Sequence, residues 1–175
     1  MPKFNDIPQL TSYGNYNIHV QWASLLEWLE SWEKEYNFDL NPDFQREHVW
    51  TEAQQIAYIE YKLRGGTHAD LLLFNHPGWN SLSNFYKHGG VLVDGKQRLN
   101  AVCRFMKDEI PAFDYRYSQY TDRLRVHIAR FTVHVNDLKT RKAVLQWYLE
   151  LNAGGTQHTK KEIEKVKNLL KKETK

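Results

Sequence analysis

Three polar clusters in this chain combine residue types that could bind an anion or a metal ion. The central one is Asp94-Gly95-Lys96-Gln97-Arg98, which lies between a short apolar run and an apolar stripe with helical spacing. A strand that turns into a helix here sets the cluster at the helix N-terminus, where free amides and the helix dipole favour anions. Lys96 and Arg98 add cationic donors, and Asp94 adds a carboxylate that could hold a metal. The cluster therefore predicts a phosphate site, unless Asp94 only caps the helix and both cations are solvated.

The upstream cluster is Phe44-Gln45-Arg46-Glu47-His48-Val49-Trp50. Arg46 can hold a phosphate or a carboxylate through two parallel hydrogen bonds. Phe44 and Trp50 offer flat surfaces on which a nucleic-acid base could stack. The alternative is that both aromatic rings anchor this segment to the core while Arg46 pairs with a nearby carboxylate.

The downstream cluster is Leu151-Asn152-Ala153-Gly154-Gly155-Thr156. Its two glycines permit a close approach of the backbone to a ligand, and the Asn152 amide can donate and accept. The alternative is an ordinary helix C-terminus. A Walker Gly-Lys-Ser/Thr pattern is absent from the chain, which excludes a P-loop. The eight histidines and the single cysteine of the whole chain show no zinc-ligand spacing.

The elements that must position these clusters follow from apolar periodicity and helix caps. Capping boxes are predicted at Ser24, Thr51 and Thr159. Predicted strands cover residues 16–22, 70–74, 91–93 and 125–135, the last with a bulge, and predicted helices cover 24–36, 51–64, 96–106, 140–151 and 159–170. This mixed order predicts the α+β class, as one compact domain in which helices flank a small mixed sheet.

Composition narrows the class of protein further. With 175 residues, 41% hydrophobic and 14% aromatic, the chain is neither a disordered tail nor a fibrous repeat, and a net charge of +3 excludes a histone-like polycation. A lone Cys103 suits a reducing compartment. The start of the chain resembles no signal peptide, and no apolar run is long enough for a membrane span. We therefore expect a cytoplasmic protein without a membrane partner.

The C-terminal segment is locally basic. Residues 156–175 carry seven lysines against three glutamates. Lys160 and Lys161 could contact a nucleic-acid backbone, although a solvated helix face with i, i+4 ion pairs would give the same pattern.

Taken in their order along the chain, over about residues 39–165, the three clusters resemble the N-terminal domain family of GmrSD-type modification-dependent restriction enzymes. That family has a ParB/sulfiredoxin-like fold and a signature close to Asp-Gly-Gln-Gln-Arg. Lys96 departs from the signature, because many members have Gln there, and its added charge favours a phosphate. The positions that match the family are Asp94, Gly95, Gln97 and Arg98 in the signature, Gln45 and Arg46 upstream, and Asn152 and Gly155 downstream.

The resemblance implies a nucleotide-binding, NTP-hydrolysing module with Mg²⁺ and GTP or ATP as cofactors. Asp94 would hold the metal, Gln97 would orient the attacking water and Arg98 would bind phosphate oxygens. The remaining expected nucleotide contacts are Gln45, Arg46, Gly95, Lys96, Asn152, Gly154, Gly155 and Thr156, and the expected DNA contacts are Phe44, Trp50, Lys160 and Lys161.

At the level of the whole protein, the resemblance implies a DNA-sensing part of a restriction, anti-phage or phage counter-defence system, encoded by a bacterium or by a phage in a bacterial host. We expect a family domain at residues 1–158 followed by a basic helix at 159–175. A His-Asn-His-type nuclease motif is absent from this sequence, so a nuclease would be a separate subunit. Two alternatives stay open: a DNA-binding module without turnover, and the protein-interaction half of a split restriction system.

Overall fold

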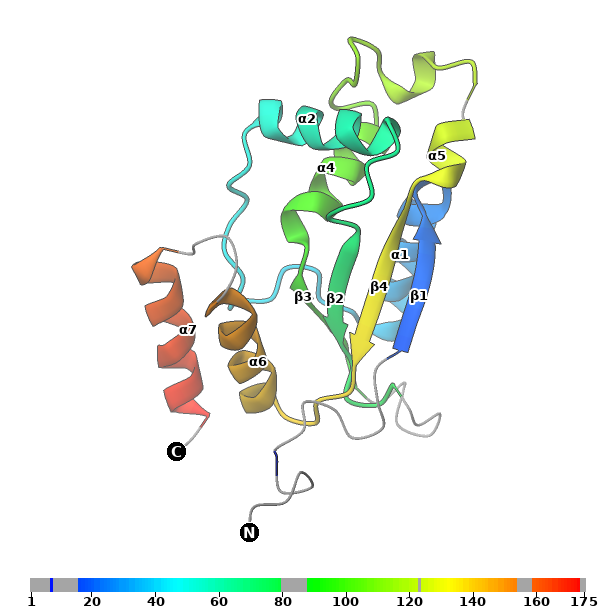
Figure 1. Ribbon diagram of the computed structural model, residues 1–175. Helices are drawn as coiled ribbons and strands as arrows, with labels where there is room; N and C mark the ends of the chain where they lie inside the picture. Colours follow the sequence, from blue (N-terminus) through cyan, green and yellow to red (C-terminus); the bar gives the residue numbers. More distant parts are fainter. Residues whose placement is uncertain (1–6, 8–15, 80–87, 123, 154–158, 174–175) are drawn as a thin grey trace.

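The computed structural model describes residues 7, 16–79, 88–122, 124–153 and 159–173. A four-stranded sheet with the order β1-β4-β2-β3 forms its centre (Figure 1). The β1–β4 and β2–β3 pairs are antiparallel and the β2–β4 pair is parallel, so the sheet is mixed. The strands are β1 (Tyr16–Gln21), β2 (Leu71–Asn75), β3 (Val91–Asp94) and β4 (Arg130–Asn136).

Helices lie on both faces of this sheet (Figure 1). The helices are α1 (Leu25–Tyr36), α2 (Glu52–Leu63), α4 (Lys96–Met106), α5 (Leu124–Ile128), α6 (Arg141–Ala153) and α7 (Lys160–Lys172), with 3-10 turns η2 (Trp22–Ser24) and η3 (Tyr117–Gln119). The predicted α+β class, with helices flanking a small mixed sheet in one compact unit, is confirmed. Within the described residues, no helix is long and apolar enough to cross a bilayer.

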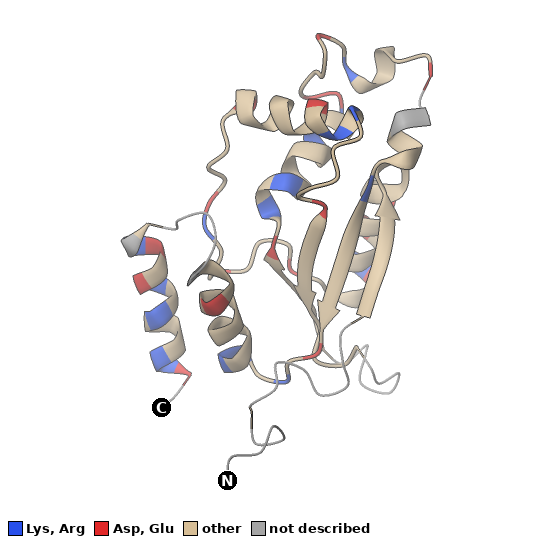
Figure 2. Cartoon of the chain, viewed as in Figure 1, with Lys and Arg blue, Asp and Glu red and all other residues tan. Residues whose placement is uncertain are grey.

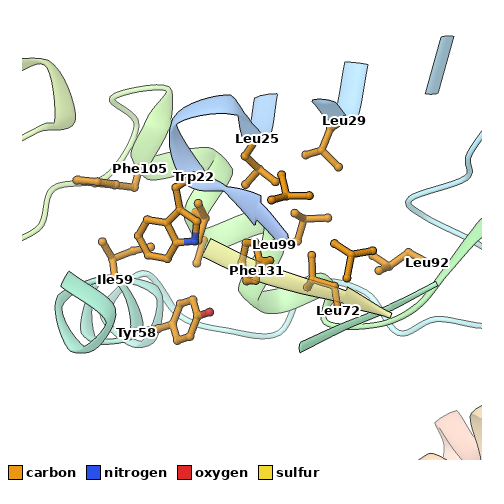
Figure 3. Close-up of a cluster of buried hydrophobic side chains, with 14 of the residues drawn as sticks. Trp22, Leu25, Leu29, Tyr58, Ile59, Leu72, Leu92, Leu99, Phe105 and Phe131 are labelled. Carbon is orange, nitrogen blue, oxygen red and sulfur yellow. The ribbon is translucent and has the colours of Figure 1, made fainter. Parts of the chain in front are cut away.

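Alternation along the strands divides the apolar side chains between two cores. Leu72 and Phe74 belong to the larger core, beneath α1, α2 and α4. Figure 3 shows Leu72 there with Trp22 and Phe131, which are also fully buried. Leu73, between Leu72 and Phe74 in β2, faces a smaller core that α6 and α7 cover on the other side of the sheet. The end of β3 lies between these two cores.

Two of the three predicted helix caps are confirmed. Thr51 and Thr159 each accept a hydrogen bond from the backbone amide three residues on, and Gln54 and Glu162 bond back to complete the capping boxes. The cap predicted at Ser24 is wrong, since its side chain makes no capping bond. Helix α1 instead continues from η2, in which the Trp22 carbonyl already accepts from the Leu25 amide.

The strand predicted at residues 125–135 is wrong in its first half. Residues 124–128 form α5, and β4 begins only at Arg130. The two phases of apolar residues mark two elements rather than one bulged strand: Val126 is buried in the larger core, whereas Ile128 is 58% exposed. The Ala129 carbonyl accepts from the Trp22 amide and so joins this bend to η2.

Candidate anion-binding site

One cavity of about 310 Å³ collects residues from all three polar clusters. It opens at the end of β3, between the start of α4, the end of α6 and the segment 44–50, which we call the strap. The residues that line it are Gln45, Arg46, Trp50, Val93, Asp94, Gly95, Lys96, Gln97, Arg98, Tyr148, Leu151 and Asn152. Clusters far apart in the sequence therefore share one site, as expected. Gly154, Gly155 and Thr156 lie outside the described residues.

The turn from β3 into α4 requires a glycine at position 95. Gly95 has φ +103°, and a Cβ atom on it would lie 2.4 Å from Leu72 Cδ2. No side chain caps α4 at this residue. The first turn of α4 therefore faces the cavity with amides that no capping side chain uses, which is the arrangement that binds anions at a helix start.

Arg98 is fixed on this turn by two hydrogen bonds. Its Nη2 donates to the Leu71 carbonyl at 2.8 Å and to Asp94 Oδ2 at 2.9 Å. Its Nε is buried and has no partner among the described residues. The guanidinium is thus held in place through Nη2, and Nη1, which makes no hydrogen bond with the described residues, is the donor left for a ligand.

Arg46 and Lys96 add two more cations. Lys96 Nζ donates to the Arg46 carbonyl at 3.3 Å, which ties the strap to α4. In the part of the chain that the structure describes, the Arg46 guanidinium has no hydrogen bond or ion pair, so the carboxylate partner considered as an alternative is not observed. Burial raises the pKa of Tyr148 to about 12, and the positive charge of Arg46 opposes that shift. The charge of Arg46 is therefore close enough to affect Tyr148, which forms one wall of the cavity.

The two glutamines of the site support the backbone. Gln97 is 8% exposed, its Oε1 accepts from the Val49 and Trp50 amides at 3.0 and 3.1 Å, and its Nε2 donates to the Glu47 carbonyl at 3.2 Å. Three of the four hydrogen-bonding positions of the Gln97 amide are thus used by the strap, so Gln97 has a structural role here, and its expected role in orienting an attacking water stays a prediction. Gln45 is also buried and donates to the Leu92 carbonyl at 2.6 Å.

The aromatic residues of the strap differ in exposure. Phe44 is 3% exposed and packs edge-on against Tyr148, with ring centroids 5.2 Å apart. The expectation that Phe44 stacks on a base is therefore wrong, since its ring belongs to the smaller core. Trp50 is only half-buried. It contacts Tyr58 and lines the cavity, so a ligand in the cavity can contact the exposed part of its indole ring.

Residues of the C-terminal helices contribute less to the cavity. Asn152 lines it from within α6, which extends to Ala153, and its side-chain Nδ2 donates to the Tyr148 carbonyl at 2.6 Å. Lys161 is exposed on α7 and does not line the cavity; the Lys160 side chain is not described. Val166 of the same helix is 1% exposed and packs α7 into the smaller core.

A metal ion would find few protein ligands here. The described residues contain no group of three or more His, Cys, Asp or Glu side chains that could hold one. Asp94 is the only carboxylate of the cavity in the described structure, and it pairs with Arg98. A Mg²⁺ ion at Asp94 would need phosphate oxygens and water as its other ligands, which is how Mg²⁺ often binds beside nucleotides. The Mg²⁺ expectation stays a prediction.

Sequence reasoning assigned no role to His48 or Tyr148. Tyr148 belongs to an apolar helical stripe, and His48 is one of eight scattered histidines. In the structure Tyr148 forms a cavity wall, and the His48 ring lies 2.9 Å from amide nitrogens of both Gln55 and Asn100. The only sequence signal for His48 is its place between Arg46 and Trp50.

Comparison of this chain with models of protein families, with curated proteins and with solved structures found no match. The resemblance to the GmrSD-type family therefore depends on the three motifs alone. Membership of that family, and of the ParB/sulfiredoxin-like fold, stays a prediction.

Proposed function

We propose that this cavity binds the phosphate groups of a nucleotide. The observation that carries the proposal is the convergence of Arg46, Lys96 and Arg98 with the uncapped start of α4 on one cavity. Against these three cations the cavity has one carboxylate in the described structure, Asp94, so its formal charge is positive. Cationic donors beside a helix N-terminus favour a polyanion over a neutral ligand.

The cavity suits the phosphate chain better than a whole nucleotide. Its volume of about 310 Å³ lies at the small end of ligand pockets. Trp50 offers a half-buried indole on its wall, on which a base can stack. We therefore infer that the phosphates enter the cavity while the base lies at its rim against Trp50.

Hydrolysis is the second part of the proposal. Phosphoryl transfer depends mainly on positioning and on neutralising charge, which the three cations supply. Mg²⁺, when bound with the nucleotide, would neutralise further charge, and Asp94 would be its protein ligand. None of the described residues lining the cavity is a histidine or a second carboxylate, so the attacking water would give its proton to the phosphate rather than to a strong general base.

Calorimetric titration with ATP, GTP and their diphosphates, with and without Mg²⁺, tests the binding, and phosphate release tests turnover. We expect saturable binding that Arg46→Ala weakens while Arg64→Ala, at a cation outside the cavity, does not. Arg64 is a suitable control because it lies over the Phe113 ring, away from the site. Equal affinity of both variants would remove Arg46 from the site, and absence of binding to every nucleotide would contradict the proposal.

A second candidate function is contact with DNA. It is favoured by the exposed lysines of α7, which Figure 2 shows as blue bands on that helix. Lys161, Lys165 and Lys172 lie on its exposed side, opposite the buried Val166. Such a stripe contacts phosphates without reading sequence. Together the two activities suit a DNA-sensing module of a restriction or counter-defence system, with any nuclease supplied by another subunit.

A further inference from the structure

The ring of His48 joins the strap to two helices. Its Nε2 lies 2.9 Å from Gln55 Nε2 of α2, and its Nδ1 lies 2.9 Å from Asn100 Nδ2 of α4. The same strap brings Arg46 and Trp50 to the cavity. His48 is therefore placed to control where those two side chains lie, although it does not line the cavity itself.

The orientation of the Gln55 amide is fixed by its other bonds. Gln55 is 2% exposed, its Oε1 accepts from Arg104 Nη1 at 3.0 Å, and its Nε2 donates to the Trp50 carbonyl at 3.2 Å. A half-turn of the amide would set its nitrogen against the Arg104 guanidinium, with two donors facing each other. Gln55 Nε2 is therefore the donor toward His48, and His48 Nε2 accepts.

This bond decides which nitrogen of His48 carries the proton. A neutral imidazole has one N–H and one lone pair, so Nδ1 holds the hydrogen when Nε2 accepts. The structure places Asn100 Nδ2 against this N–H. The Nδ1–H tautomer therefore requires a half-turn of the Asn100 amide, which makes no other side-chain hydrogen bond with the described residues, so that its oxygen accepts from Nδ1. The tautomer is the opposite of the one that free histidine favours in water. Protonation of Nε2 would set an N–H against the Gln55 donor and break the bridge.

We propose that His48 is a positioning residue of the anion site, whose neutral Nδ1–H form holds the strap in place and whose protonation releases it. The inference rests on the proposed function in one respect, that the strap serves an anion site. The tautomer of His48 follows from Gln55 and Arg104 alone.

The charges around the ring favour the neutral form. Partial burial lowers the pKa of His48, and the positive charges of Arg104 and Lys96 on α4 lower it further, against a raising effect of the Trp50 carbonyl. Arg104 is itself paired with Glu52 of α2 at 3.0 Å, and Glu47 precedes His48 in the strap. Because the folded pKa is lowered, the bridge is complete above about pH 6.5 and is lost as the pH falls through the lowered pKa of the folded protein.

Two measurements on the full chain test this. Nitrogen-15 NMR of the His48 ring at neutral pH should show the Nδ1–H tautomer. Sulfate serves as the probe anion, because its charge does not change in this range, and its affinity should fall about three- to tenfold between about pH 8 and about pH 5. Simple attraction to a newly charged imidazolium predicts a rise instead. His127→Asn, a control at an exposed histidine of α5, should follow the wild type.

Gln55→Glu provides the sharper variant. Its carboxylate still accepts from Arg104 but also accepts from His48 Nε2–H, so the tautomer should invert and the fall in sulfate affinity on acidification should disappear. An Nε2–H tautomer in the wild type, or an affinity that rises as the pH falls, overturns the inference. Absence of sulfate binding at every pH contradicts the proposed anion site instead. In that case the tautomer measured by NMR still tests whether His48 Nε2 accepts a hydrogen bond from Gln55.

Discussion

The three cations of the cavity are held in different ways, and this sets what each substitution should do. Arg98 is bound to the Leu71 carbonyl and to Asp94, so it also joins α4 to β2. Lys96 joins α4 to the strap. The Arg46 guanidinium has no partner in the described structure. Arg46 is therefore the residue whose replacement should report on the ligand alone.

We expect Arg46→Ala to weaken nucleotide binding about 10- to 100-fold, the value of a charge-assisted hydrogen bond of about 1.5–3 kcal/mol. Its melting temperature should stay within about 1–2 °C of the wild type, because the guanidinium bonds to no other described residue. Calorimetry and thermal unfolding measure the two effects. A large fall in stability with unchanged affinity would show that Arg46 is structural.

Gly95→Ala should destabilise the protein by about 2–4 kcal/mol, because the added Cβ meets Leu72 and the backbone has a positive φ. Gly65→Ala is the matched control. Gly65 also has a positive φ, of +90°, but a Cβ there would meet nothing within 4 Å. That variant should be destabilised by only about 1 kcal/mol. Urea unfolding compares them, and equal effects would mean that the clash with Leu72 is easily relieved.

At the scale of elements, the site depends on how the strap is fastened to its neighbours. Gln97 at the start of α4 bonds to three backbone groups of the strap, and Gln45 bonds to the Leu92 carbonyl of β3. These bonds are buried or partly buried, where an unpaired amide costs more than it does in water. The strap therefore has a defined position without belonging to a helix or a strand.

Gln97→Ala tests this role against the catalytic one expected from the motif. Two amides and a carbonyl would be left without their partner, so we expect the free energy of unfolding to fall by about 2–4 kcal/mol and anion binding to weaken. A purely catalytic residue would leave both unchanged and abolish only turnover. Urea unfolding together with a phosphate-release assay separates these outcomes.

Much of this architecture was predictable, for local reasons. Thr51 and Thr159 start helices because their capping boxes are complete within four residues. Ser24 has the same sequence pattern, yet it is the last residue of η2, in which the Trp22 carbonyl already accepts from the Leu25 amide, and only the tertiary structure reveals this. The motifs of the three clusters also predicted that their residues meet at one site, and these residues line one cavity. The roles of Gln97 and His48 did not, because each depends on residues about 50 positions away.

At the scale of the whole molecule, a net charge of +3 is small, so the placement of charge matters more than its sum. Positive charge lies at the start of α4 and along α7 (Figure 2). The α4 charges line a cavity, whereas the α7 charges lie on an exposed helix side. These two regions should therefore respond differently to salt, because exposed charges are screened more strongly than partly buried ones.

Exchange of Lys161 and Lys165 for glutamate should weaken binding to duplex DNA. The slope of log affinity against log salt should fall by about one for each phosphate that the variant no longer neutralises. Nucleotide affinity should stay unchanged, since neither lysine lines the cavity. Filter binding over a salt series measures the slope. An identical slope in the variant would show that α7 does not contact DNA.

The most direct test of the central claim is a titration of nitrogen-15-labelled protein with pyrophosphate, followed by NMR. If the cavity binds phosphates, the backbone amides of Gly95, Lys96 and Gln97 and the Arg98 Nε–H should shift together and saturate at one affinity. Shifts confined to the α7 lysines, or none at the start of α4, would contradict the account.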